Sequence, residues 1–151
     1  MSYKGKFSPR NPEKYKGNPT NIIYRSLLER RFMVYLDQTP AVLEWSSEEF
    51  IIPYISPVDN RVHRYFPDFY IKYKNKEGVT VTELIEVKPF SQCSPPNPKK
   101  SKTKTGRTSK RYLREVQTYI VNEAKWKAAT SYCNDRKWGW RILTEKDINI
   151  Y

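Results

Sequence analysis

The stretch Leu84-Ile85-Glu86-Val87-Lys88-Pro89 decides the fold of this chain, because it has the character of an apolar strand that ends on an acid, a spacer and a lysine. Side chains alternate along a strand, so Glu86 and Lys88 point to the same face. Residues 65–70, Tyr-Phe-Pro-Asp-Phe-Tyr, are rich in strand-forming aromatic residues and carry Asp68. If the two stretches are neighbouring strands, two carboxylates and one ammonium group meet at one point.

That combination is typical of sites that hydrolyse phosphodiester bonds. Asp68 and Glu86 offer the hard oxygen ligands that Mg²⁺ prefers, and Mn²⁺ accepts the same ligands. A lysine at the position of Lys88 can orient or deprotonate the attacking water, or stabilise the charge of the transition state. The bare pattern is common, and most copies of it are surface charges. The proline before Asp68 and the apolar residues around Glu86 favour a site over a chance match.

A third acid, Glu29, lies on a predicted helix of roughly 19–37. The helix is expected to begin at Asn18-Pro19, because asparagine caps helices and proline is favoured in the first turn. Phe32 and Met33 lie three and four residues after Glu29, so the acid lies on or beside an apolar stripe. Taken alone, Glu29 is most simply an exposed helix residue. Taken with the other three residues, it is a candidate member of the same site.

The rest of the chain predicts a single α/β domain with a mixed (α+β) sheet. Strands are expected at 48–55, 61–73 and 79–88, joined by short turns into an antiparallel meander. Residues 89–108, rich in proline and lysine, predict a long mobile loop. A helix over 109–134 and a strand over 138–144 follow, and a right-handed crossover would place that strand parallel in the same sheet. A capped helical turn is expected at 144–147. The expected apolar stripe of the long helix consists of Leu113, Val116, Ile120, Ala124, Ala128 and Tyr132.

The charge of the chain favours a polyanionic partner, of which nucleic acid is the usual one. Lysine and arginine number 28 against 16 acids, which gives a net charge of +12. Residues 1–17 form a basic segment, expected to be an extended arm, partly disordered or packed on the surface. The densest basic cluster falls at the end of the predicted loop and the start of the long helix. Its members, all candidate DNA contacts, are Lys99, Lys100, Lys102, Lys104, Arg107, Lys110 and Arg111.

The composition also argues against several other classes of protein. With His63 as its single histidine, the chain is a poor candidate for a histidine-based zinc site or a Ser-His-Asp hydrolase. Cys93 and Cys133 have no metal-ligand spacing and are expected to be reduced thiols in a cytosolic protein. The sequence contains no apolar stretch long enough to span a membrane, so no membrane partner is expected.

The order of these elements, with an acid on the first helix, Pro67-Asp68 on the second strand and Glu86-Val87-Lys88 on the third, resembles the PD-(D/E)xK nuclease superfamily. Two further strings, Ser26-Leu27-Leu28-Glu29 and Ile142-Leu143-Thr144-Glu145, are similar to the branch that contains the TnsA transposon endonuclease. Longer strings, including residues 61–70, resemble the head completion nucleases of T-even-type tailed phages.

This resemblance implies a restriction-endonuclease-like core and a Mg²⁺-dependent DNA endonuclease that acts late in phage assembly, when the filled head is made ready to join the tail. Asp68 and Glu86 would be the metal ligands, Lys88 would lie at the attacking water, and Glu29 would be an auxiliary acid. The implied partners are double-stranded DNA and phage head portal or neck proteins, and a homo-oligomer is left open. The expected location is the host cytoplasm during assembly, with the head-neck region of the virion as the alternative.

Two other functions stay open at this point. One is a junction resolvase of the same superfamily, which would normally be a stable dimer. The other is a structural DNA-binding joint protein of the virion with a vestigial active site. The intact set of Glu29, Asp68, Glu86 and Lys88 argues against the vestigial site, because a decayed site usually loses one such residue.

Overall fold

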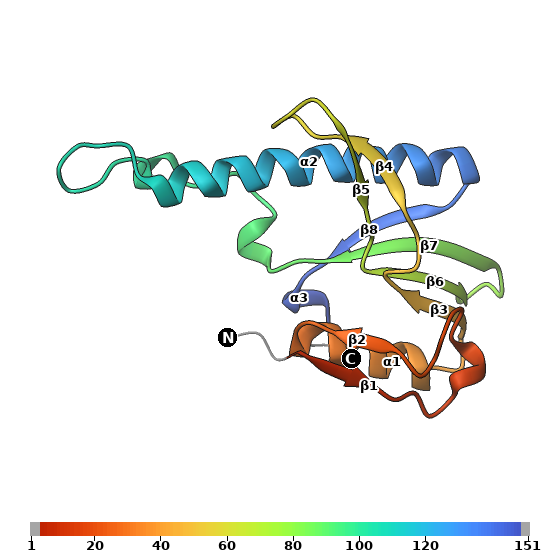
Figure 1. Cartoon of the computed structure of the whole chain (residues 1–151). Coiled ribbons are helices and arrows are strands. Elements are labelled where there is room, and N and C mark those ends of the chain that lie inside the picture. Colours follow the sequence, from red (N-terminus) through yellow and green to blue (C-terminus); the bar gives the residue numbers. More distant parts are fainter. Residues whose placement is uncertain (1–3, 149–151) are drawn as a thin grey trace.

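A four-stranded mixed sheet forms the centre of the computed structural model, which describes residues 4–148 (Figure 1). Its strand order is β3 (Val42–Ser47), β6 (Phe69–Lys74), β7 (Thr80–Val87) and β8 (Gly139–Leu143). The first three are antiparallel neighbours, whereas β8 runs parallel to β7. The predicted mixed sheet and the parallel placement of the last strand are confirmed.

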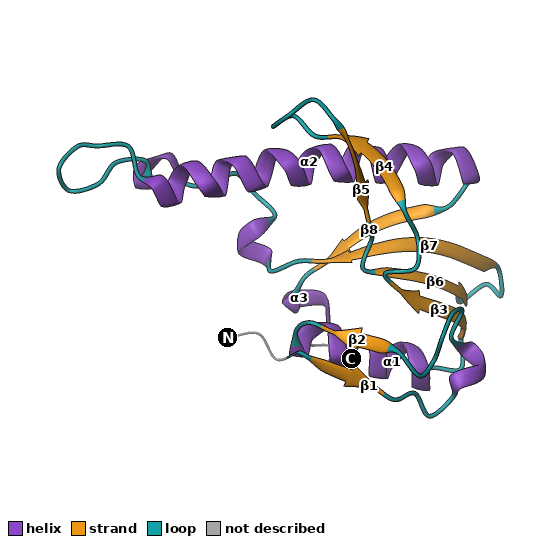
Figure 2. Ribbon diagram, viewed as in Figure 1, coloured by secondary structure: helices purple, strands orange, loops and turns teal. Residues whose placement is uncertain are grey.

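Two helices cover opposite sides of this sheet, α1 (Leu27–Gln38) and α2 (Lys110–Arg136) (Figure 2). The core on the side of α1 is built around Phe32, Trp45 and Ile85, and the core on the side of α2 includes Leu84 and Ala129. Ile85 and Leu84 are neighbours on β7 and enter different cores, as the alternation along a strand requires. The central strands are therefore buried on both faces, and they form a rigid base for polar groups at their ends.

The predicted three-strand meander is wrong in its first strand. Strand β4 (Ile52–Ile55) pairs with β5 (Val62–Tyr65) in a separate two-stranded sheet that packs on α2, and the partner of β6 is the earlier strand β3. The predicted strand over 61–73 is two strands, with a break at 66–68. Pro67 has no N–H group to donate to a strand ladder, which accounts for a break at this point.

The first predicted helix begins later than expected. Residues Ile22–Tyr24 form strand β2, which pairs with β1 (Gly5–Phe7). Two isoleucines and a tyrosine favour a strand over a helix, and their propensity outweighs the Asn18-Pro19 start signal. The actual cap is Ser26, whose side chain accepts a hydrogen bond from the N–H of Glu29.

From residue 4 onward, the basic segment at the start of the chain is packed on the fold, which is one of the two outcomes expected for it. It contains a 3-10 turn η1 (Pro12–Lys14), and its Phe7 and Tyr15 are buried in the core. The Lys14 ammonium donates to the carbonyls of Leu36, Asp37 and Thr39 at the end of α1. This segment therefore satisfies the free carbonyl groups of a helix terminus. Residues 1–3 of the expected arm lie outside the described residues.

Helix α2 begins after its cap Ser109, close to the expected start, and only the inner part of the predicted stripe, Ala124, Ala128 and Tyr132, packs against the core. Its buried residues are Asn122, Ala129 and Cys133, whereas Leu113 and Ile120 are 53% and 43% exposed. The outer half of α2 extends past the sheet, so its apolar residues have no core to enter (Figure 1). Within residues 4–148, no helix combines the length and the apolar character needed to cross a membrane.

Residues 89–108 project beyond the sheet together with the outer half of α2 (Figure 1). They contain two short 3-10 turns, η2 (Phe90–Gln92) and η3 (Pro98–Lys100), and a turn closed by a bridge between Lys102 and Thr108. The expected mobility of this loop stays a prediction. After β8, the short helix α3 (Glu145–Ile148) is capped by Thr144 and Asp147, as expected.

Candidate active site

The pairing of β6 with β7 brings Asp68 and Glu86 together. Phe69 lies opposite Ile85, so one step further along this antiparallel pair places Asp68 beside Glu86. The Asp68 carboxylate accepts a hydrogen bond from the Val87 N–H at 2.8 Å. Lys88 follows directly, and its Nζ lies 3.9 Å from Oε2 of Glu86. The two carboxylates and the ammonium therefore meet at the end of β7.

Glu29 approaches the same point from the first turn of α1. Its backbone N–H is held by the Ser26 side chain, and its carboxylate accepts a hydrogen bond from the N–H of Arg25 at 3.1 Å. The charge of Glu29 acts on Asp68, and that of Glu86 acts on Glu29. Asp68, Glu86 and Lys88 therefore meet at one point, and Glu29 lies near enough for its charge to affect the pKa of Asp68.

Burial, and after it the crowding of the acids, sets the electrostatics of this site. Burial raises the pKa of Asp68 well above its ordinary value. The charges of Glu86 and Glu29 and a hydrogen bond with Glu86 raise this pKa further, whereas the hydrogen bond from the Val87 N–H lowers it. Burial also raises the pKa of Glu29, with smaller upward contributions from Glu48 and Glu86. Acids that destabilise each other's charge in this way are a favourable environment for a cation.

The ligands available fit Mg²⁺ better than a metal that needs a complete protein cage. Among the described residues, no group of three or more histidine, cysteine or acidic side chains is placed to hold a metal ion. The site offers the paired carboxylates of Asp68 and Glu86. Mg²⁺ is usually held by one or two carboxylates and keeps several of its waters, so this pair suits it.

Tyr65 is a site residue that the sequence analysis did not single out. Its hydroxyl donates a buried hydrogen bond to Oε1 of Glu86 at 2.8 Å, while Lys125 of α2 lies 5.7 Å from the centre of its ring. Burial, with the adjacent Glu86 charge, raises the pKa of Tyr65, so the phenol remains a proton donor. Such a hydrogen bond fixes which way the Glu86 carboxylate faces.

Glu48 is a second residue that was missed. Its φ of 56° lies in the left-handed region, which non-glycine residues seldom occupy outside turns and functional sites. Its N–H donates to the carbonyl of Asp68 at 3.1 Å, and its carboxylate pairs with Arg25 at 3.0 Å. Glu48 thus fixes the backbone of Asp68. No motif could have indicated this role, because a backbone conformation leaves no pattern of residue types.

The predicted DNA-binding residues do not lie at the site formed by Asp68, Glu86 and Lys88. All of them are exposed, and they lie on the projecting loop and the first turn of α2 (Figure 1). Lys100 and Arg111 line a pocket between the loop and α2, and Arg111 also pairs with Glu115 at 3.0 Å. Contact with DNA by Lys99, Lys100, Lys102, Lys104, Arg107, Lys110 and Arg111 stays a prediction.

Comparison with known proteins agrees with this arrangement. Residues 39–145 match the family model described as "TnsA-like endonuclease N terminal", a range that includes Asp68, Glu86 and Lys88. The chain belongs to the TnsA-like endonuclease family. It is also 39% identical over 148 residues to the head completion nuclease of Enterobacteria phage T4, a match that covers 98% of this chain and 95% of that protein.

Family membership places the mixed sheet and its flanking helices in the restriction-endonuclease-like fold class, as the sequence predicted. It also identifies this TnsA-like chain as a nuclease, and the similarity to the T4 protein indicates a nuclease of phage type. The candidate site lies where the ends of β6 and β7 meet, with α1 supplying one further acid.

Proposed function

We propose that this chain is a Mg²⁺-dependent DNA endonuclease of the PD-(D/E)xK type that acts in phage head completion. The observation that carries the proposal is the convergence of Asp68, Glu86 and Lys88 at the end of β7, with the Lys88 ammonium 3.9 Å from the Glu86 carboxylate. Paired buried acids with an adjacent lysine have no evident stabilising role, because the acids disfavour each other's charge. The arrangement is better suited to chemistry on a phosphodiester.

Each residue has a role that follows from its position. Asp68 and Glu86 would hold the metal, and when bound, Mg²⁺ or Mn²⁺ polarises the phosphate and lowers the pKa of a coordinated water. The Val87 N–H and the Tyr65 hydroxyl keep the two carboxylates facing each other. The Lys88 ammonium has N–H donors for the attacking water or for the charge that develops on the phosphate. Glu29 would act as an auxiliary acid on the α1 side.

The substrate and the setting are inferred from charge and from the named relative. A net charge of +12, concentrated on the projecting loop, supports double-stranded DNA as the substrate. The T4 relative is named a head completion nuclease, and we propose the same step for this chain. It would act in the host cytoplasm with portal or neck proteins, on DNA already packaged in the head, before head and tail join.

Nicking of supercoiled plasmid tests the activity. We expect the wild-type chain to nick with Mg²⁺ or Mn²⁺ and to be inactive with EDTA, because the carboxylates alone lack an electrophile. Lys88→Ala should bind DNA normally and lose most turnover, since its ammonium would act in the chemical step. Lys76→Ala, which removes an exposed lysine from the turn between β6 and β7, is the matched control and should cut normally. Equal nicking by the two variants would remove Lys88 from the mechanism.

A phage assembly experiment tests the biological role. A phage that carries Glu86→Ala should produce filled heads and separate tails that fail to join, although the variant protein is folded and abundant. The substitution removes one proposed metal ligand that is almost fully buried, so the outer surface available for docking is unchanged. Normal particle yields in electron micrographs of the lysate would contradict a role for catalysis and would favour a structural DNA-binding joint protein.

A further inference from the structure

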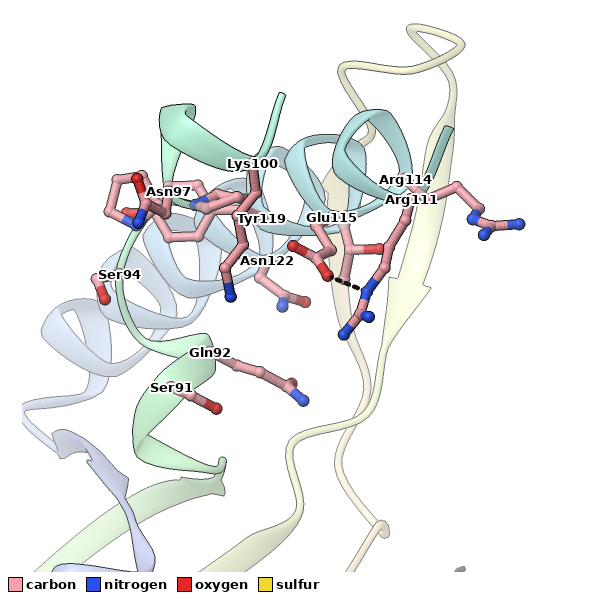
Figure 3. A pocket seen from close by; sticks show the side chains of 13 residues that line it. Ser91, Gln92, Ser94, Asn97, Lys100, Arg111, Arg114, Glu115, Tyr119 and Asn122 are labelled. Atoms are coloured by element: carbon pink, nitrogen blue, oxygen red, sulfur yellow. Dashed lines mark hydrogen bonds and ion pairs between the residues drawn. The ribbon is translucent and has the colours of Figure 1, made fainter. Parts of the chain in front are cut away.

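A polar pocket of about 640 Å³ lies between residues 91–100 and the outer half of α2 (Figure 3). It begins three residues after Lys88, on the segment that leaves the proposed catalytic strand. Ser91 and Gln92 line its inner end, and Lys100, Arg111 and Arg114 contribute the basic groups. The proposed nuclease activity does not use this pocket, and its side chains are suited to a ligand with both charge and hydrogen-bonding edges.

The charge of the pocket is positive. Lys100, Arg111 and Arg114 line it, and among its described lining residues Glu115 is the one acid. Arg111 is paired with Glu115 at 3.0 Å, which leaves the charges of Lys100 and Arg114 uncompensated by this acid. Arginine and lysine in a concave site favour phosphate groups, and the planar guanidinium can bind two phosphate oxygens at once.

The inner end of the pocket carries an unusual buried amide. Asn122 is 5% exposed, lies on the same buried helix face as Ala129 and Cys133, and lines the pocket. In the described part of the chain no hydrogen bond to a protein group holds this amide, and its polar atoms are not fully buried, so they open into the pocket, which the exposed Gln92 also lines. Both amides are therefore free to bind a ligand that enters the pocket. Asparagine and glutamine amides can each donate to and accept from the edge of a nucleobase.

We propose that this pocket binds one nucleotide of the DNA strand that passes the catalytic group. Its phosphate would lie toward Lys100 and Arg114, and its base edge toward Asn122 and Gln92. The volume is larger than a phosphate alone requires, and the lining offers both basic groups and amides, which suit the phosphate and the base of a nucleotide. A nucleotide that enters the pocket must leave the base stack, as one at a strand end does. This inference rests on the proposed function, because it takes DNA as the substrate.

Titration of the full chain with deoxyadenosine monophosphate, followed by NMR of side-chain amide groups, tests the pocket without cleavage. We expect the Asn122 and Gln92 amide signals to shift with the nucleotide and to stay in place with inorganic phosphate. The Gln92 shift should shrink in Asn122→Ala. The same shifts with phosphate as with the nucleotide would reduce the pocket to an anion site, and no shift of either amide would exclude nucleotide binding there. Both results would overturn the proposal.

Steady-state cleavage of oligonucleotide DNA separates the pocket from the catalytic group. Asn122→Ala and Arg114→Gln should each raise KM roughly tenfold, as expected when a hydrogen bond to a base edge or a phosphate is removed, and leave kcat unchanged. Lys127→Gln, on the exposed opposite side of the same helix, is the matched control and should leave KM unchanged. Pocket variants that behave like Lys127→Gln would overturn the pocket while the nuclease stands. A wild-type chain that cuts no DNA would overturn the proposed function, and the amide titration would then still decide the pocket.

Discussion

The acid group at the end of β7 and the basic loop beyond it are held in opposite ways. Asp68 and Glu86 are hydrogen-bonded to the Val87 N–H and the Tyr65 hydroxyl, on strands buried on both faces. The basic residues of 99–111 are exposed on a segment that projects from the sheet. Hydrolysis needs reacting groups placed to a fraction of an ångström, whereas attraction to a polyanion tolerates movement. The rigid framework of the molecule therefore supports the proposed catalytic residues, and the basic residues lie outside it.

The largest effect is expected for Asp68→Asn, which removes one proposed metal ligand and little volume. Cleavage should fall about 10³-fold or more, as for the loss of a central catalytic group. The fold should be as stable as the wild type or more so, because the buried acid is disfavoured by Glu86 and Glu29. Plasmid nicking and thermal melting, measured on one preparation, check both parts. A folded Asp68→Asn variant that still cuts DNA would contradict the claim that the rigidly held acids at the end of β7 carry out the reaction.

Tyr65→Phe should have the next largest effect. It removes the hydroxyl that orients Glu86 and keeps the ring between Glu86 and α2. Loss of such an outer hydrogen bond typically lowers metal affinity roughly 10- to 100-fold, so the Mg²⁺ concentration for half-maximal cleavage should rise accordingly. Activity should recover at high Mg²⁺. A loss of rate that no Mg²⁺ concentration restores would show that Tyr65 acts on the substrate itself.

Alanine at Lys99, Lys100, Lys102 and Lys104 should have a smaller effect of a different kind. Binding to all DNA sequences should weaken, and the slope of log affinity against log salt should fall by about 0.9 for each phosphate that the variant no longer neutralises. The rate at saturating DNA should not change, because none of these residues reaches the acid group. Filter binding at several salt concentrations gives the slope. A slope equal to that of the wild type would show that the loop does not contact DNA.

The smallest effect is expected in the pH dependence of stability. Because the pKa of Asp68 is raised in the folded chain, the folded chain holds this proton more tightly than the unfolded one. Stability should therefore fall as pH rises from the unfolded pKa through the folded pKa, and level off above it. In EDTA, melting scans from about pH 4 to about pH 8 should show this fall in the wild type and a weaker one in Asp68→Asn. Identical stability profiles for the wild type and Asp68→Asn would contradict this prediction. Addition of Mg²⁺ should restore the stability that the wild type loses at high pH.

The sequence was most informative where residue type and strand period act together. Alternation along 84–88 placed Glu86 and Lys88 on one face, and the order of elements indicated the mixed sheet and its parallel last strand. Prediction failed where tertiary contacts decide. The hairpin of β4 and β5 separates β3 from β6 along the chain, and no local pattern marks which strands pair across such an insertion. The outer part of the predicted apolar stripe of α2 stays exposed, because Leu113 and Ile120 lie beyond the sheet.

At the candidate site, too, the features set by local residue pattern were predicted and those set by tertiary contacts were not. Its four chemical groups were predicted from residue type and spacing, whereas Tyr65 and Glu48 were not. Tyr65 looked like any strand aromatic, and only the tertiary placement of the β4–β5 hairpin brings its hydroxyl to Glu86. Glu48 acts through a left-handed backbone and a hydrogen bond to the Asp68 carbonyl. Contacts that support a site depend on the assembled structure, so a sequence motif records the reacting groups more faithfully than their supports.

Binding of Mn²⁺ followed by electron paramagnetic resonance tests the central claim most directly, because it detects the metal at the acid pair without any cleavage. In the presence of DNA, we expect the wild type to bind Mn²⁺ that Mg²⁺ displaces. Glu86→Gln should lose this binding, because the change removes a ligand charge and preserves shape. Lys88→Met should retain it. Equal Mn²⁺ binding by the wild type and Glu86→Gln would contradict the account, because the acids at the end of β7 would then not be the metal site.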